Sequence, residues 1–346
     1  MAVKKTAVGE QQPKDLWKES ADSKTIKDFA NETIDVEKIL WYGESNSGKT
    51  RAYLDILAHL KNEENVSAEK VCMCIIFSDR ATGITKLYHL IPKEYVNRVF
   101  IFPVSNYEEM VKATAESERI LMKHFEKTKT HGWLILELLE EAWRFAQDYY
   151  SRQSFGETLA DLMATKRQEV HNLMVAKNKE DKETAYQVLS GFRDWVTIKF
   201  FHNFNWIDKI KRMPFNVGAT AEIREEVNPD SMFAKVGAKP AGEKDNMHRF
   251  DTIIYKKHLK DKFYQRCFKL TGYSRLYSDV DITDKNSYTI HKKVCEKFER
   301  SGYKTGAMEE IEKEAGIEPP KPKAKEEPKS EEKPKEEKKE EDEWEI

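Results

Sequence analysis

The feature that most constrains this chain is an eight-residue segment that links a short apolar run to a helical pattern. It consists of Gly43, Glu44, Ser45, Asn46, Ser47, Gly48, Lys49 and Thr50, and it fits the pattern G-x-x-x-x-G-K-[S/T]. Glycines let a backbone bend until its N–H groups point at phosphate oxygens, and the following helix adds its positive end. Lys49 would place a positive charge at the β- and γ-phosphates, and the Thr50 hydroxyl is a ligand for Mg²⁺. This segment, the phosphate loop, predicts a nucleoside triphosphate site between a strand and a helix.

Strand and helix signals alternate along the body of the chain. Apolar runs that predict strands cover residues 38–42, 71–77, 98–104, 133–136, 215–220, 250–255 and 263–270. The continuous runs at 71–77 and 98–104 indicate strands that are covered on both faces. The last two runs alternate and look more antiparallel. This order predicts an α/β domain with a mostly parallel sheet and antiparallel strands toward its C-terminal end.

The stretch 145–210 has a helical pattern and is rich in Lys, Arg and Glu. Its charges are expected to form a solvated helix face, with a nucleic-acid-binding stripe as the alternative. Its aromatic residues at helical spacing are predicted to lie in the core: Trp195, Phe200, Phe201, Phe204 and Trp206.

The two ends of the chain differ in composition from its body. Residues 318–346 hold eight lysines, twelve acids and five of the eleven prolines, so they carry a charge of −4 and leave +2 on the rest. Such a segment buries too little apolar surface to offset its ordering entropy, and we expect a disordered acidic tail. A flexible segment at 1–24 and one ATPase domain at 25–317 complete the expected organisation.

The chain carries the signals of a cytoplasmic protein. It has four cysteines without a CxxC pair, which we interpret as reduced thiols. Its basic N-terminal residues are not followed by an apolar core, so a secretory signal is not expected. We expect no membrane contact, because no apolar stretch approaches the length of a membrane span.

Two acids follow strand signals and are candidates for the chemistry of hydrolysis. A phosphate loop needs a carboxylate beside Mg²⁺ and another that orients the attacking water. Glu137 ends the run 133–136, and it stands where Asp is usual, one methylene longer. Asp79 closes the run 71–77 and could position water at the carboxyl edge of the sheet, with an ordinary turn residue as the alternative.

Two further acids and one hydroxyl lie near these positions. Glu140 and Glu141 follow Glu137 and are interpreted as first-turn acids that complement a helix dipole, with a role in the hydrolysis site as the alternative. Thr220 ends the run 215–220 and is placed to sense the γ-phosphate.

The phosphate loop, Ser78-Asp79-Arg80, Trp133–Glu137 and Asn216–Thr220 together resemble RecA-like ATPases. The closest likeness is to the stand-alone recombination ATPases of phages and archaeal viruses, over roughly residues 35–270. The phosphate loop is the specific part of this resemblance, and the other matches rest on their order along the chain. The chain departs from the pattern at Arg80, where some relatives have a second acid, and at Glu137.

The resemblance implies a RecA-type core that uses ATP and Mg²⁺ and acts on single-stranded DNA in strand pairing or annealing. It would make Asp79 the catalytic carboxylate and Glu137 the acid on the magnesium side. It also implies a DNA-contacting loop after the γ-phosphate-sensing strand.

Residues 221–246 form the expected long loop after Thr220. Candidate DNA-binding cations in it are Arg224, Lys235, Lys239 and Lys244. Phe233 could stack on a base. The acids in the same loop leave a lid, a subunit contact or a plain surface loop as alternatives.

These observations lead to one predicted function and several rivals. The chain is predicted to be a Mg·ATP-hydrolysing RecA-like protein that acts on DNA, as a homo-oligomer. A viral DNA-packaging motor, a small-molecule kinase and a nucleotide-gated binding module with little turnover are the alternatives. The acidic tail is expected to serve solubility, with recruitment of a protein partner as the alternative.

Overall fold

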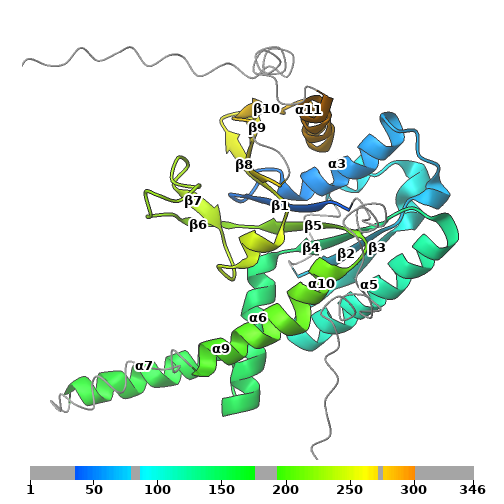
Figure 1. The fold of residues 1–346 in the computed structure, drawn as a ribbon. Helices are drawn as coiled ribbons and strands as arrows, with labels where there is room; N and C mark the ends of the chain where they lie inside the picture. Colours follow the sequence, from blue (N-terminus) through cyan, green and yellow to red (C-terminus); the bar gives the residue numbers. More distant parts are fainter. Residues whose placement is uncertain (1–35, 79–85, 176–192, 272–275, 301–346) are drawn as a thin grey trace, which may run out of the picture.

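A computed structural model describes residues 36–78, 86–175, 193–271 and 276–300. The expected flexible segment 1–24, the acidic tail 318–346 and Asp79 lie outside these residues. The described part is an α/β domain in which helices cover both faces of one sheet (Figure 1).

The central sheet has eight strands in the order β10-β9-β8-β1-β5-β4-β2-β3. Their bounds are β1 (Lys38–Gly43), β2 (Met73–Phe77), β3 (Val99–Pro103), β4 (Trp133–Glu137), β5 (Asn216–Ala221), β8 (Thr252–Leu259), β9 (Lys262–Leu270) and β10 (Val280–Asp281). Strands β1 to β5 and β8 run parallel to one another, and β9 pairs antiparallel with both of its neighbours, β8 and β10. The predicted sheet is confirmed. The expectation for 250–255 holds in part, because β8 is antiparallel to β9 but parallel to β1.

The helices form two layers (Figure 1). One face of the sheet carries α3 (Lys49–Asn62), which also contacts α11 (Ser287–Arg300). The other face carries α5 (Tyr107–Thr128), α6 (Leu139–Phe155) and α10 (Asp208–Arg212). The remaining helical elements are η1 (Ala68–Lys70), η2 (Tyr88–Leu90), η3 (Lys93–Arg98), α7 (Leu159–Val175), α9 (Arg193–Lys199), the π-helix η4 (Phe200–Ile207) and η5 (Asn246–Arg249).

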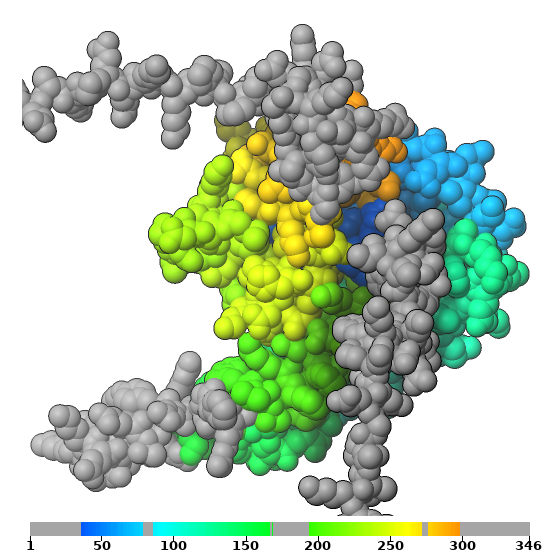
Figure 2. Space-filling view, in the orientation of Figure 1, coloured from blue at the N-terminus to red at the C-terminus, as the bar shows by residue number. Residues whose placement is uncertain are grey.

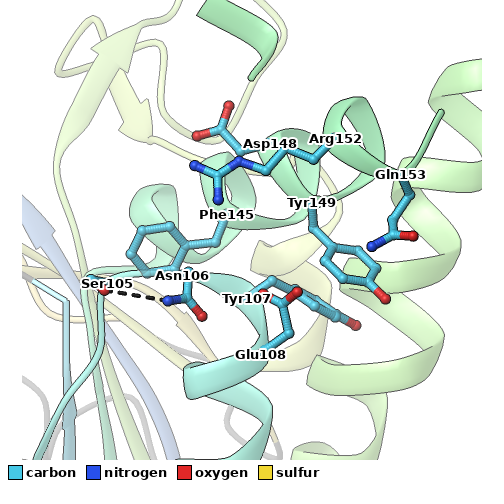
Figure 3. A pocket seen from close by; sticks show the side chains of 9 residues that line it. All are labelled: Ser105, Asn106, Tyr107, Glu108, Phe145, Asp148, Tyr149, Arg152 and Gln153. Atoms are coloured by element: carbon cyan, nitrogen blue, oxygen red, sulfur yellow. Dashed lines mark hydrogen bonds between the residues drawn. The ribbon is translucent and has the colours of Figure 1, made fainter. Parts of the chain in front are cut away.

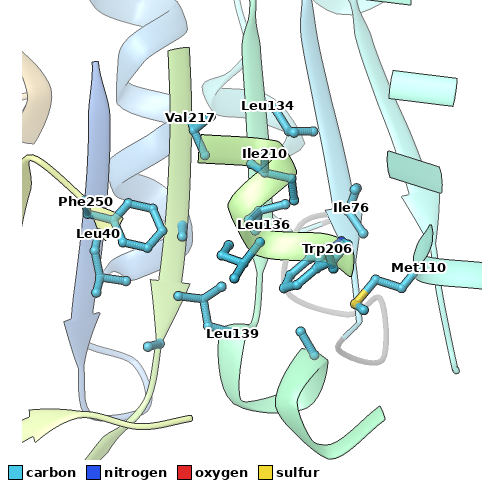
Figure 4. Close-up of a cluster of buried hydrophobic side chains, with 14 of the residues drawn as sticks. Leu40, Ile76, Met110, Leu134, Leu136, Leu139, Trp206, Ile210, Val217 and Phe250 are labelled. Atoms are coloured by element: carbon cyan, nitrogen blue, oxygen red, sulfur yellow. The ribbon is translucent and has the colours of Figure 1, made fainter. Parts of the chain in front are cut away.

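Alternation along the strands divides the core between the two faces. Ile39 and Trp41 of β1 pack toward α3, whereas Leu40 and Tyr42 pack toward the opposite layer. Figure 4 shows that second cluster, in which Leu40, Leu134, Leu136 and Val217 of the strands meet Met110, Trp206 and Ile210 of the helices. Because both faces are covered, the inner strands read as continuous apolar runs.

Strand β3 departs from that rule. It is the last strand beside β2, and its Phe100 and Ile101 are 38% and 45% exposed. The expectation that run 98–104 is covered on both faces is therefore wrong. An apolar run predicts a strand, but the helices that cover it come from distant sequence.

The aromatic run near residue 200 also differs from expectation. Trp206 is buried and donates to Thr114 Oγ1 at 2.9 Å, but Phe200 and Phe204 are 49% and 58% exposed. Their rings stack on each other at 5.2 Å. One helix contacts the sheet along one side only, so these two rings lie on the side that the core does not use.

No helix in the described ranges is long and apolar enough to cross a bilayer.

Candidate phosphate-binding site

The phosphate loop leaves the carboxyl end of β1 and enters α3 directly. Gly48 precedes the helix with φ +87°, a left-handed conformation that favours glycine. Gly43 is held by close packing, because a Cβ there would lie 2.2 Å from the Lys256 carbonyl oxygen on β8. Both glycines are therefore required by the shape of the loop. The first turn of α3 directs free N–H groups toward the space above it.

The Lys49 side chain is buried beneath this loop. Its ammonium donates to the carbonyl oxygens of Gly43 and Glu44, each at 2.8 Å, and to Glu222 Oε1 at 3.1 Å. The first two bonds fix the charge under the loop. The third joins the loop to the segment that follows β5.

Glu137 lies beside the first turn of α3. Its two carboxylate oxygens accept hydrogen bonds from the Thr50 hydroxyl, at 2.6 Å, and from the Tyr53 hydroxyl. Burial and the nearby carboxylate raise the pKa of Tyr53 well above its usual value, so Tyr53 stays a neutral donor. Glu137 itself is only 5% exposed. Thr50 and Glu137 bring two hard oxygen ligands together, which fits Mg²⁺.

The end of β2 is tied to the end of β4. The Ser78 hydroxyl donates to the Glu137 carbonyl oxygen and accepts from the Leu138 amide, both at 2.8 Å. Asp79 follows at once and lies outside the described residues, so its predicted role in orienting water stays a prediction.

Thr220 lies on β5, fully buried and paired in register with Trp41. Its hydroxyl has no hydrogen-bond partner within the described part of the chain. Glu222 comes two residues later, directly after the end of β5 at Ala221. Within the described ranges the Thr220 hydroxyl therefore makes no hydrogen bond to the loop, whereas the Glu222 carboxylate does.

Two acids of this site, Glu140 and Glu222, were not among the residues predicted for it. Glu140, in the first turn of α6, accepts from the Glu222 amide at 3.0 Å, and its other oxygen is buried with no partner among the described residues. Burial raises the pKa of Glu140 to about 7; the Glu222 carboxylate also raises it, and Lys49 opposes the shift. The interpretation of Glu140 as a plain helix-dipole acid is incomplete. Glu141 fits that interpretation better, because it pairs with Arg144 on the helix surface.

A spacing signal for both acids was present in the sequence. Glu222 continues the strand alternation from Thr220, and Glu140 follows the acid-ended strand by three residues. Neither spacing says which way the chain turns after the strand, and this turn decides whether the carboxylate meets the loop.

The long loop after Thr220 is partly ordered as a hairpin. Strands β6 (Ile223–Glu225) and β7 (Ala238–Pro240) pair antiparallel, and we call residues 223–240 the β6–β7 hairpin. It protrudes from the body, coloured yellow-green in Figure 2. Phe233 is 1% exposed and packs against Tyr42 and Phe268, so the expectation that it is available to stack on a base is wrong.

The predicted DNA-binding cations have different surroundings. Lys235 and Lys244 are exposed. Lys239 is paired with Glu226 at 3.0 Å, and Arg224 is half-buried. The hairpin therefore offers fewer available charges than its sequence indicates.

Two cavities lie away from the phosphate loop. A hollow of about 70 Å³ between α5 and α6 is lined by Arg152, Glu108 and Asp148 among others (Figure 3), so charges of both signs face it. A larger cavity of about 390 Å³ lies at the amino ends of the strands, beside Trp133 and Asn216. Neither cavity joins the loop, which opens at the carboxyl ends.

The sequence matches no protein-family model, and comparison with curated proteins finds no match.

Proposed function

We propose that this chain is a RecA-like P-loop ATPase that binds Mg·ATP and uses ATP hydrolysis to change how it binds DNA. The contact between Thr50 and Glu137 is the observation that carries the proposal. It joins the end of the phosphate loop to the acid at the end of β4, two positions 87 residues apart.

The strand order supports this proposal further. Strand β5 lies between β1, which leads into the loop, and β4, which ends in Glu137. The carboxyl ends of all three parallel strands therefore meet at one edge, where open α/β sheets bind their ligands. Thr220 and Glu222 reach the same edge from β5.

Each residue of the site has a task in this proposal. The loop amides and Lys49 bind the triphosphate, and Thr50 and Glu137 would hold Mg²⁺. The ion would neutralise charge on the phosphate oxygens when bound. Glu140 and Asp79 are the carboxylates available to orient water, and the buried Thr220 hydroxyl is the candidate sensor of the γ-phosphate.

The proposed action on DNA rests on the resemblance and on two exposed lysines, Lys235 between β6 and β7 and Lys244 after β7. It is tested by measuring ATP hydrolysis with and without single-stranded DNA. Stimulation by DNA supports the proposal, whereas turnover that ignores DNA indicates a small-molecule enzyme. Binding without any turnover would leave a nucleotide-gated binding module.

A further inference from the structure

Glu222 makes contacts of the kind that a phosphate group makes in a phosphate loop. Its Oε1 lies 3.1 Å from Lys49 Nζ, and both of its oxygens lie 3.4 Å from the Ser45 hydroxyl. A carboxylate and a phosphate oxygen are both anionic acceptors, and both favour an ammonium and a hydroxyl as donors. Glu222 and a bound triphosphate would therefore use the same donors.

The donors of Lys49 are fully used in this arrangement. An ammonium has three N–H donors, and those of Lys49 go to Gly43, Glu44 and Glu222. The first two acceptors are carbonyl oxygens of the loop itself. The Glu222 side chain is 35% exposed and can turn away from the loop, so it is the partner that an incoming phosphate can replace.

The charges act in the same direction. A triphosphate at Lys49 would bring further negative charge close to Glu222, with Glu140 bonded to the Glu222 amide. Like charges at such short range repel strongly in a partly buried site. Binding therefore favours an arrangement in which the Glu222 carboxylate has left Lys49.

Glu222 is also the residue that joins β5 to the β6–β7 hairpin. Its carbonyl oxygen accepts from the Ala241 amide at 2.9 Å, and the next pair, Ile223 with Pro240, opens the hairpin ladder. A side chain fixed on Lys49 therefore restrains the base of the hairpin. Its release removes that restraint.

We propose that Glu222 is an internal competitor for the triphosphate, which must displace it from Lys49, and that this displacement loosens the base of the β6–β7 hairpin. The inference rests on the proposed nucleotide site. It adds a means by which phosphate binding reaches the exposed hairpin.

The first test compares the full-length protein with Glu222→Gln, which keeps the shape of the side chain and removes its charge. Calorimetry with a non-hydrolysable Mg·ATP analogue, and separately with inorganic tripolyphosphate, should give affinities about tenfold tighter in the variant. Glu225→Gln is the matched control, because Glu225 is exposed on the same hairpin and the charge change is identical. It should bind like the wild type.

The outcomes separate this inference from the function on which it rests. Equal or weaker binding by a folded Glu222→Gln protein, with wild-type binding intact, overturns the competitor and leaves the ATPase proposal standing. Absence of binding in both proteins overturns both. In a Lys49→Ala protein there is no lysine for Glu222 to occupy, so Glu222→Gln should increase the affinity by less than it does when Lys49 is present. An equally large increase in affinity would contradict the proposed competition.

Hydrogen exchange tests the second half of the inference. Nucleotide should speed amide exchange in residues 223–240 of the wild type, and Glu222→Gln should show the faster exchange before nucleotide is added. Exchange that ignores nucleotide in the wild type would overturn the link to the hairpin.

Discussion

The phosphate loop and the β6–β7 hairpin both leave the carboxyl edge of neighbouring strands, yet their structures have different origins. Most contacts of the loop are local in sequence, through the left-handed Gly48, the lysine beneath the loop and the helix that begins at once, and its main distant contact is Gly43 against the Lys256 carbonyl oxygen. The hairpin depends on partners far away, including Tyr42 against Phe233 and Glu140 against Glu222. A short motif specifies the residue types of the phosphate loop and most of its contacts, whereas the structure of the hairpin is specified mainly by distant parts of the fold.

The largest effect that tests this comparison comes from removing the positive charge of Lys49 beneath the phosphate loop. Lys49→Ala should weaken Mg·ATP binding by about a hundredfold, since a charge-assisted bond from Lys49 to a phosphate oxygen is worth up to about 3 kcal/mol and Glu222 is left facing the phosphates alone. Calorimetry measures the loss. Lys235→Ala, an exposed lysine of the hairpin, should bind nucleotide normally, and a similar loss in both variants would mean that the loop has no special role.

Glu137→Gln separates chemistry from binding within the same site. It keeps one oxygen as an acceptor for the Thr50 or the Tyr53 hydroxyl, places an NH₂ group at the other position and loses the negative charge that suits Mg²⁺. We expect hydrolysis to fall by about thirtyfold to a hundredfold, and nucleotide affinity to change by less than about fivefold. Phosphate release measures the first and calorimetry the second. Glu141→Gln on the adjoining helix is the control, and an equal effect there would refute the assignment of Glu137.

Local sequence was enough to predict the sheet and the loop but not the full site. The apolar residues before Glu137 and Thr220 predict a strand by themselves, so strands β4 and β5 were both predicted. Glu140 and Glu222 follow the same two strands, but they meet only because β4 and β5 pair in the sheet. Phe233 was misjudged for the same reason, because its burial depends on Tyr42, which lies 191 positions earlier.

A pH experiment tests whether Glu140 belongs with the loop or with an ordinary helix end. Its pKa rises from 4.5 in the unfolded chain to about 7 in the fold. Between these values the folded state binds more protons than the unfolded state, so stability falls as pH rises and the cost is fully present above pH 7. Glu140→Gln should therefore raise the free energy of unfolding by about 3 kcal/mol at pH 8 and change it little at pH 4.

Urea unfolding at the two pH values provides this measurement. Glu141→Gln should give the same difference from wild type at both. A pH-independent effect of Glu140→Gln would return Glu140 to the role of a surface helix acid.

The smallest expected effect concerns DNA at the β6–β7 hairpin and the segment that follows it. Lys235→Ala together with Lys244→Ala should lower affinity for single-stranded DNA about threefold to tenfold at low salt, and should reduce the salt dependence of binding. Nucleotide binding should stay unchanged. Fluorescence anisotropy measures the affinity for DNA and its salt dependence. Lys123→Ala, at an exposed lysine of α5, is the charge control. A loss no larger than that of the control would remove these two lysines from the DNA-binding surface.

The contact between Gly43 and the Lys256 carbonyl oxygen has a practical consequence for cutting the chain into pieces. Strand β1 is flanked by β8 as well as β5, so a fragment ending near residue 246 would contain the entire motif and lack one of its two neighbours. Such a fragment should expose the edge of β1 and lose the backbone against which the first glycine is seated. Deletion mapping by motif alone would therefore place the minimal nucleotide-binding unit too short, and its boundary belongs beyond the β8–β9 pair.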